Sequence, residues 1–392
     1  MSVYIDLTEF LGNPILTGIQ RVTAEICRWW PNKDLRPVRL ADGKLVEMPG
    51  SLISAIARCF KDVDGAAVRE VCTLREKAIA AVLPDGPEVI LVPELFYDPQ
   101  RVAFFRHLDD RSRQRYRFII YDLMPILHPE YFAPDMPHDI ISGYFSMVRR
   151  IPHCGFISEW TQHTYCRRLL RSSGSTGVVL RLGSDGLGPE PATSLDYRPL
   201  HFCTVGTIEP RKNHALILDA FEPLLRTVEG LQLTFLGRLG WVDSAFRQRL
   251  EWMAGNCPGF EWIPDGSDDC IRQHVEGARA TVYVSSAEGF GLPPVESLWL
   301  GTPVIASPNL PSLELIGSQG VEIVDPLDAV ALRKAVTKFT DDTFALSKVR
   351  EAREVDLPTW ASFARQIADW CGAPKSCGAH SGAAVTVGRG IR

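Results

Sequence analysis

Two glutamates stand eight residues apart around a glycine-rich turn, in the stretch Ala287-Glu288-Gly289-Phe290-Gly291-Leu292-Pro293-Pro294-Val295-Glu296. Carboxylates can work as a general acid and base pair, or they can accept hydrogen bonds from sugar and ribose hydroxyls. The alternative without chemistry is a capping acid followed by an ordinary helix glutamate. Glu288 favours a functional role because glycines beside it allow close approach of a ligand, whereas for Glu296 the two interpretations are even.

A second candidate group is the stretch GTIEPRKNH, which contains Thr207, Arg211 and Lys212. Two adjacent cations before a predicted helix complement a diphosphate, and backbone N–H groups there add further donors. A solvated charge pair is the alternative. We favour the diphosphate site because the pair follows a predicted strand. A separate diphosphate site also makes an acid and base pair of Glu288 and Glu296 the weaker hypothesis.

Two other glycine turns follow predicted strands. Gly237-Arg238-Leu239-Gly240-Trp241 allows close approach of a ligand, with Trp241 either walling a cleft or packing in a tight turn. Near the start of the chain, Gly18 and Ile19 open a predicted helix, whose N-terminal N–H groups suit an anion.

The elements that position these groups alternate between strand and helix. Apolar runs at 3–7, 89–92, 117–123, 201–205, 231–236, 280–286 and 303–307 predict buried strands, separated by segments with helical periodicity. This alternation predicts an α/β fold with two doubly wound, Rossmann-like parallel sheets. A chain of 392 residues suits two domains, with the site in the cleft between them.

The predicted domains are residues 1–190 and 191–357, joined by a linker at 183–199 that is rich in glycine, proline and serine. We further expect a helix at 66–82 and a terminal helix at 358–371. Residues 372–392 are small and of low complexity, which predicts a disordered tail.

Composition excludes several classes of protein. The net charge of −5 argues against a nucleic-acid partner. Ten cysteines without zinc spacing predict reduced thiols in a cytoplasmic protein, and no signal peptide or membrane-spanning run is expected. Arginines cluster at 111–117 and at 167–171. We favour the interpretation that both clusters lie on solvent-exposed faces of the protein. The alternative is that they make peripheral contact with the inner membrane surface.

Together these motifs resemble the retaining family 4 glycosyltransferases of the GT-B fold, and in particular the mannosyltransferases of bacterial polysaccharide and O-antigen synthesis. The resemblance covers about residues 1–371 and includes the stretches TGIQRV, YDLMPILHPEYF, ISEWT, LRLGSDG, GTIEPRKNH, GRLGW and EGFGLPPVES, in that order.

The resemblance implies roles for individual residues. Lys212 would hold the donor diphosphate, Glu288 the transferred sugar and Glu296 the ribose, while the turn at Gly18 and Ile19 approaches the donor phosphates from the other domain. The remaining donor-binding residues would be Arg211, Thr207, Gly237, Arg238, Gly289, Phe290, Gly291 and Leu292. The terminal helix is expected to cross back onto the N-terminal domain, which would bind the acceptor.

This sequence departs from the family pattern in two places. Thr207 stands where many members have an arginine, so Arg211 has to supply the second cation. Tyr121 replaces a histidine beside the transferred sugar. Asp122 matches the acidic residue that follows this histidine in the family. It is the third catalytic candidate, together with Glu288 and Lys212. His128 is the alternative residue that could replace the family histidine.

The implied function is that of a hexosyltransferase in surface polysaccharide synthesis. It would move a hexose, with mannose as the leading candidate, from a nucleotide-diphosphate sugar to a lipid-linked oligosaccharide. GDP-mannose is the leading donor, with no metal or other cofactor expected. Two rivals remain: a sugar-nucleotide epimerase or phosphorylase on the same scaffold, and a non-catalytic protein that binds sugar nucleotides. A nicotinamide-dependent oxidoreductase is set aside because no compact GxGxxG motif follows the first predicted strand.

Overall fold

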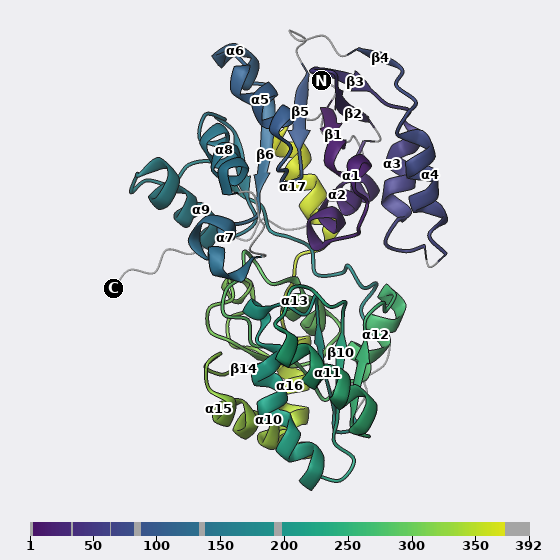
Figure 1. Cartoon of the computed structure of the whole chain (residues 1–392), viewed down its shortest axis with the longest axis vertical. Coiled ribbons are helices and arrows are strands. Elements are labelled where there is room, and N and C mark those ends of the chain that lie inside the picture. Colours follow the sequence, from purple (N-terminus) through teal and green to yellow (C-terminus); the bar gives the residue numbers. More distant parts are fainter. Residues whose placement is uncertain are drawn as a thin grey trace.

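The computed structural model describes residues 3–32, 34–62, 64–81, 88–132, 138–191 and 198–372, and Figure 1 shows their arrangement. The tail predicted at 372–392 lies outside these residues except for Gly372, as does the part of the predicted linker at 192–197. The rest forms two α/β domains stacked along the long axis of the molecule (Figure 1).

An eight-stranded sheet forms the centre of the N-terminal domain. Its strand order is β4-β3-β2-β1-β5-β6-β7-β8, and neighbours are parallel except at β2–β3 and β3–β4. The strands are β1 (Val3–Asp6), β2 (Leu35–Ala41), β3 (Lys44–Glu47), β4 (Ala80–Ala81), β5 (Val89–Val92), β6 (Tyr116–Ile120), β7 (Cys154–Phe156) and β8 (Val178–Val179).

A six-stranded, wholly parallel sheet forms the centre of the C-terminal domain, in the order β11-β10-β9-β12-β13-β14. Its strands are β9 (His201–Val205), β10 (Gln232–Leu236), β11 (Phe260–Ile263), β12 (Ala280–Tyr283), β13 (Val304–Ala306) and β14 (Val321–Ile323). The predicted pair of doubly wound sheets is thereby confirmed.

Helices cover both sheets. Those of the N-terminal domain are α1 (Thr8–Gly12), α2 (Gly18–Trp29), α3 (Ser51–Arg58), α4 (Ala66–Leu74), α5 (Pro99–His107), α6 (Asp110–Arg113), α7 (Met124–Leu127), η1 (Pro129–Tyr131), α8 (His138–Val148), α9 (Glu159–Tyr165) and the π-helical turn η2 (Cys166–Leu170). Those that begin after β9 are η3 (Pro210–Lys212), α10 (His214–Thr227), α11 (Ser244–Asn256), α12 (Asp268–Gly277), α13 (Leu292–Trp299), α14 (Leu313–Ile316), α15 (Ala329–Lys338), α16 (Asp342–Arg353) and α17 (Trp360–Trp370).

Burial of the central strands explains why they form. All four residues of β5 (VILV) and all four of β12 (ATVY) are buried. A parallel strand covered by helices on both faces is apolar on both faces, so it carries a continuous apolar run. These two strands lie inside their sheets, and the loops that follow them therefore open at the carboxyl edges, where the two domains meet.

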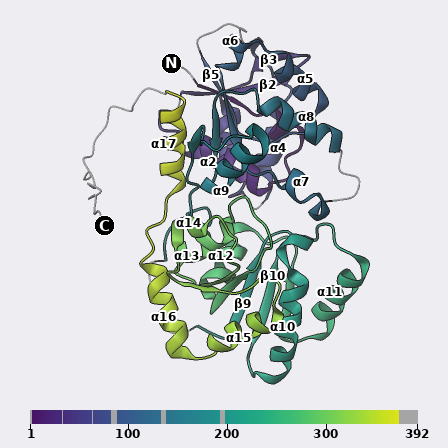
Figure 2. The same cartoon turned by 90° about the vertical axis from the view of Figure 1, so that its left-hand side faces the viewer.

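The last helix returns to the first domain. Figure 2 shows α16 beside the C-terminal sheet and α17 along the N-terminal domain, where α17 packs against α2. The crossing is fixed by the Ser184 N–H, which donates to the Pro358 carbonyl at 2.8 Å, and by the Trp360 N–H, which donates to Asp185 at 2.6 Å. These hydrogen bonds join the two segments of chain that cross between the domains, one at residues 184–185 and the other at residues 358–360.

Several local expectations differ from the structure. The helix expected at 66–82 ends at Leu74, because the chain then turns to pair β4 with the sheet edge at β3. The segment between β1 and α2 contains the short helix α1, whose Phe10 and Leu11 are buried. The helices α3 and α5 were not predicted.

The arginine cluster at 111–117 is not simply a solvated face. Arg113 is buried and pairs with Asp110, and Arg115 pairs with Glu88 at 3.4 Å. In the second cluster, by contrast, Arg167, Arg168 and Arg171 are exposed. Among the described residues, no helix has the length and apolar character needed to cross a bilayer.

Candidate functional site

Lys212, Arg211 and Glu288 form a compact charged cluster at the carboxyl edge of the C-terminal sheet. The Glu288 Oε1 atom lies 2.6 Å from an Arg211 guanidinium nitrogen and 3.2 Å from Lys212 Nζ. Arg211 also binds Glu209 at 2.6 Å. The two sequence motifs, separated by about 80 residues, are therefore one site.

Tyr283 completes this cluster from the last position of β12. Its hydroxyl donates to Glu288 Oε1 at 2.8 Å and lies 2.8 Å from Lys212 Nζ, which also sits over the Tyr283 ring at 4.8 Å from its centroid. Arg211, Lys212 and Tyr283 therefore all contact the same oxygen atom of Glu288.

The charges of the cluster stabilise one another. Burial alone would raise the pKa of Glu288, but Lys212, Arg211 and the Tyr283 hydroxyl outweigh it and lower that pKa to about 2. Burial lowers the pKa of Lys212, and Glu288 opposes this. Glu288 is therefore a fixed anion at neutral pH, suited to accept hydrogen bonds rather than to donate a proton.

Asn213 holds the cationic loop in place. Its backbone lies in the left-handed region (φ 55°), where asparagine is among the more tolerant residues, and this ends η3 and starts α10. The Asn213 side-chain amide donates to the Val284 carbonyl and to Ser286, each at 2.8 Å. The loop after β9 is thereby tied to the chain after β12.

Gly289 lies directly against the N-terminal domain. A Cβ at this position would stand 2.5 Å from the Tyr121 carbonyl oxygen, so only glycine fits. The Gly289 carbonyl accepts hydrogen bonds from Ser158 at 2.9 Å and from Thr161 at 3.2 Å. The close approach that we expected for a ligand is here made by the other domain.

Asp122 follows β6 and faces the same turn. Its carboxylate accepts a hydrogen bond from the Met124 N–H at 2.9 Å. Burial raises the pKa of Asp122, while that N–H and Arg211 act in the opposite direction. His128, the alternative to Asp122, stacks on Tyr131 and contacts Glu130 at 3.1 Å.

A cavity of about 480 Å³ opens beside Glu288 between the two domains. Its walls come from α7 and α9 of the N-terminal domain and from the loops after β12 and β13. Its lining residues include Met124, His128, Trp160, Glu288, Asn309 and Glu314.

Glu296, the second glutamate of the motif, belongs to a separate cluster. It lies in the second turn of α13 and is buried, and a Cβ on Gly186 would stand 2.6 Å from its Oε1 atom. The same Cβ would stand 3.1 Å from Trp360 Nε1 and 3.5 Å from Arg21. Burial raises the pKa of Glu296 to about 7, against the opposing effect of Arg21.

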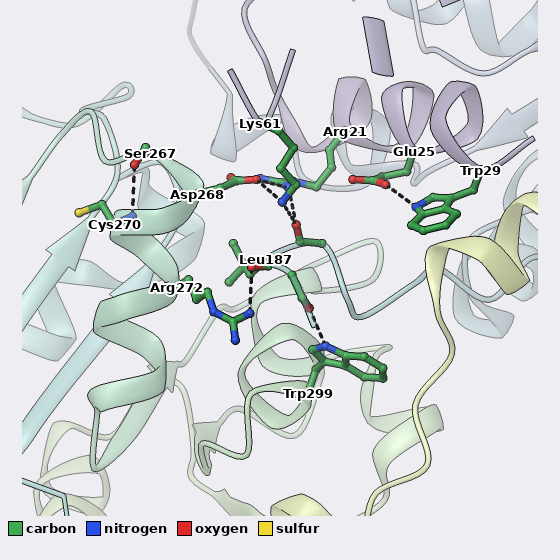
Figure 3. A network of polar contacts seen from close by, with 12 residues as sticks. Arg21, Glu25, Trp29, Lys61, Leu187, Ser267, Asp268, Cys270, Arg272 and Trp299 are labelled. Carbon is green, nitrogen blue, oxygen red and sulfur yellow. Dashed lines mark hydrogen bonds and ion pairs between the residues drawn. The ribbon is translucent and has the colours of Figure 1, made fainter. Parts of the chain in front are cut away.

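Figure 3 shows the ion pairs that join the domains next to this cluster. Arg21 of α2 binds both carboxylate oxygens of Asp268, at 2.9 and 2.5 Å, and Lys61 binds Asp268 at 3.2 Å. Lys61 also donates to the Gly186 carbonyl at 2.6 Å. Asp268 lies in the first turn of α12 and thus receives two cations from the other domain.

Of the remaining predicted donor-binding residues, two lie at the start of α2 and one contacts the other domain. Gly18 is the first residue of α2, and a Cβ there would meet no atom within 4 Å. Ile19 is half-buried against the core. Arg238 donates to the Ile15 carbonyl of the N-terminal domain at 3.0 Å, and Trp241 donates to Tyr131 at 2.6 Å.

Two predicted positions have structural explanations. Gly237 has a φ of 152°, and a Cβ there would stand 2.2 Å from the Gly206 carbonyl oxygen, so this glycine is needed for contact between neighbouring loops. Thr207 packs at Gly240 in the same contact. In the motif turn, Phe290 is buried, Leu292 is half-buried and Gly291 has a φ of 94°.

Sequence reasoning missed Tyr283, Arg21 and Lys61. A signal existed for Tyr283, because it ends the strand just before Glu288. Arg21 follows Gly18 by three residues and so lies on the same helix face, but nothing local identifies Asp268 as its partner. Among the described residues, no three histidine, cysteine, aspartate or glutamate side chains gather as a metal site.

Solved structures share this fold over nearly the whole chain. The chain is similar to HepE from Anabaena, solved in complex with UDP and glucose, with a TM-score of 0.64, 15% identity, and coverage of 94% of this chain and 98% of that one. Sucrose-phosphate synthase from Thermosynechococcus elongatus gives a TM-score of 0.61, 17% identity and the same coverage of both chains. The fold is thus the GT-B fold.

Sequence similarity is concentrated in part of the chain. Residues 192–354 match the family described as glycosyl transferases group 1. A serotype-specific mannosyltransferase, WbdA, from Escherichia coli is 36% identical over 104 residues, 26% of this chain and 13% of WbdA. O-antigen chain mannosyltransferase B, also from Escherichia coli, is 34% identical over 141 residues, 35% of this chain and 36% of that protein. The matches thus span about a third or less of these relatives.

Proposed function

We propose that this chain, which has the GT-B fold and resembles group 1 glycosyltransferases over residues 192–354, transfers a hexose from a nucleotide-diphosphate sugar to a saccharide acceptor. One observation carries the proposal. Lys212 and Arg211 converge on buried Glu288 at the carboxyl ends of β9 and β12, the edge at which ligands bind in parallel α/β sheets.

In the proposed reaction the acceptor oxygen attacks the anomeric carbon from the face that the leaving group occupies. The bond between that carbon and the phosphate oxygen breaks, and its electron pair goes to the diphosphate. The acceptor proton passes to the same diphosphate, and configuration is retained. Lys212 and Arg211 stabilise the charge that develops there, which is the main task in such a transfer.

Glu288 holds the sugar in this proposal. Its carboxylate stays ionised because its pKa is about 2, and Oε1 is already fixed by three side chains, so Oε2 accepts a sugar hydroxyl. Asp122 approaches from the other domain and contacts the same sugar. Lys212 and Arg211 provide the positive charge at the diphosphate, so we propose a reaction without a metal ion.

GDP-mannose is the proposed donor, because two of the similar proteins are mannosyltransferases. The proposed acceptor is a growing, lipid-linked oligosaccharide of a surface polysaccharide. Exposed Arg167, Arg168 and Arg171 would support peripheral contact with an anionic membrane surface at the cytoplasmic face.

A thermal-shift screen with GDP, UDP, TDP and ADP tests the proposal first. A nucleotide that binds only the folded protein raises its melting temperature. We expect the largest shift with GDP, a smaller shift in Lys212→Ala, and an unchanged shift in Lys334→Ala, which changes an exposed lysine of α15. The absence of a shift with every nucleotide would overturn the proposed function.

Product analysis separates the rival functions. Donor incubated without acceptor and recovered with an inverted sugar centre would identify an epimerase. Tight nucleotide binding without turnover on any saccharide would identify a non-catalytic binding protein. Activity that persists in EDTA is the result expected for a reaction without a metal ion.

A further inference from the structure

We propose that Trp241 is a positioning residue, which holds the two domains closed and thereby sets the loop that carries Arg211 and Lys212 against the N-terminal domain. This role rests on the proposed function, because it concerns the alignment of the two cations with Asp122. It also explains a tryptophan for which the sequence allowed only a cleft wall or a tight turn.

Trp241 bridges the two domains. Its indole Nε1 donates a hydrogen bond to the Tyr131 carbonyl at 2.6 Å, and its ring stacks on that of Phe132, with centroids 6.1 Å apart and planes inclined by 22°. The centroid separation is in the range of favourable aromatic pairs. We call Trp241, Tyr131 and Phe132 the clasp. Trp241 is 37% exposed, so the clasp is a surface contact that can open without unfolding either domain.

On the C-terminal side, the turn that carries the clasp indole is attached to the loop that leads to the cations. The Ile208 N–H donates to the Arg238 carbonyl and the Gly240 N–H donates to the Ile208 carbonyl, both at 2.9 Å. A Cβ on Gly240 would also stand 2.9 Å from that Ile208 oxygen, so the turn and the loop are in direct contact. Ile208 is buried and lies three residues before Arg211. A displacement of the turn therefore moves the loop with the cations.

On the N-terminal side, the clasp is attached to the segment that follows Asp122. The Tyr131 N–H donates to the His128 carbonyl at 3.0 Å, and the His128 N–H donates to the Met124 carbonyl at 2.8 Å. The Met124 N–H in turn donates to the Asp122 carboxylate at 2.9 Å. Short hydrogen-bonded segments thus connect the clasp to Asp122 in one domain and to the cations in the other.

Opening of the clasp should affect the chemical step more than donor binding. Lys212, Glu288 and Tyr283 all belong to the C-terminal domain and contact one another, so this group stays assembled when the domains separate. Asp122 belongs to the other domain and would lose its alignment with them. We therefore expect loss of the clasp to lower kcat with little change in KM for the donor.

Two measurements on the full chain test this role: the steady-state release of GDP from GDP-mannose, with water as the acceptor, and small-angle X-ray scattering. We expect Trp241→Ala to lower kcat about tenfold, as for the loss of one neutral hydrogen bond and one aromatic contact, with KM within about twofold of the wild type. Its radius of gyration should increase. Trp241→Phe keeps a stacked ring and should recover part of the lost kcat. Trp252→Ala, which changes an exposed tryptophan of α11, should match the wild type in every measurement.

A double-mutant cycle tests whether Trp241 acts through the other domain. Phe132→Ala removes the stacked contact from the N-terminal side, so it should also lower kcat. The double variant should be no slower than Trp241→Ala alone, because both changes open the same clasp. Losses in kcat that multiply in the double variant would contradict the role.

Two other outcomes would overturn it: unchanged kcat and scattering in Trp241→Ala, or a raised KM with unchanged kcat, which would assign Trp241 to donor binding. The thermal shift with GDP, measured on the same samples, shows that each variant is folded. A wild-type protein that neither binds GDP nor releases it from GDP-mannose contradicts the transferase function. Scattering still tests the clasp in that case, since it needs no substrate.

Discussion

Gly289 of the C-terminal domain and Asp122 of the N-terminal domain lie so close that a Cβ on Gly289 would stand 2.8 Å from the Cβ of Asp122. Glu288 precedes this glycine and carries the Arg211 and Lys212 contacts. The position of the turn that follows Glu288 is therefore coupled to the packing of one domain against the other.

The first prediction concerns this contact. In Gly289→Ala the new methyl group would collide with the Tyr121 carbonyl and Asp122, and relief requires the turn or a whole domain to move. We expect transferase activity to fall at least about 100-fold, since misplacement by about 1 Å can have that effect. Gly255→Ala, where a Cβ meets no atom within 4 Å, is the control and should keep full activity.

Removal of the Lys212 cation from the proposed diphosphate site should lower the rate of the chemical step more than it weakens donor binding. For Lys212→Ala we expect kcat to fall about 10²- to 10³-fold, the usual effect of losing one group that stabilises developing charge. Glu288→Gln should raise KM for the donor and lower kcat. The controls are Lys334→Ala and Glu229→Gln, both exposed. Activity retained in folded Lys212→Ala would contradict the diphosphate assignment.

Tyr283→Phe removes a hydroxyl that contacts both Glu288 and Lys212. The ring remains, so packing and the contact with the Lys212 ammonium group are kept. We expect the free energy of unfolding to fall by about 1–2 kcal/mol, as for a buried hydrogen bond to a charged group. Urea denaturation measures this change. An unchanged midpoint would show that the hydroxyl does not stabilise the cluster.

Glu296 predicts a pH dependence of stability. Its pKa is about 7 in the folded protein and 4.5 ordinarily, so between these values the folded state binds more protons than the unfolded state. The free energy of unfolding therefore falls as pH rises from 4.5 to 7 and is level above 7. At 1.36 kcal/mol per pH unit, this single group accounts for up to about 3 kcal/mol.

Glu296→Gln should remove this dependence, because the amide resembles the protonated acid at every pH. Urea denaturation at pH 5, 6, 7 and 8 is the measurement. We expect a flatter profile for Glu296→Gln than for the wild type, and a wild-type profile for the exposed control Glu229→Gln. Parallel profiles for all three proteins would rule out an elevated pKa at Glu296.

The ion pair between Arg21 and Asp268 should hold the domains together before donor binds. Asp268→Asn removes the charge that both Arg21 and Lys61 bind, whereas Asp269→Asn changes the exposed neighbour on the same helix end. We expect only Asp268→Asn to increase the radius of gyration in small-angle X-ray scattering and to reduce stability by about 2 kcal/mol. Identical scattering from both variants would contradict this role.

Much of the fold follows from local patterns. Continuous apolar runs such as residues 89–92 and 280–286 are typical of strands buried on both faces, and their alternation with helices specifies two parallel sheets. The helix expected at 66–82 was wrong beyond Leu74, because pairing at a sheet edge is a contact between distant segments. The helix α5 was missed because apolar and polar residues do not separate on its two faces.

The sequence by itself determined which residues stand at the carboxyl edges: Lys212 and Glu288 follow buried strands, and parallel strands bring their following loops to one edge. Only the tertiary structure decided what surrounds them. It places Glu296 among Arg21 and Trp360 rather than beside Glu288, and it pairs Arg21 with Asp268 across 247 positions of sequence. Contacts between domains depend on the shapes of two folded surfaces, and no periodicity in either segment records them.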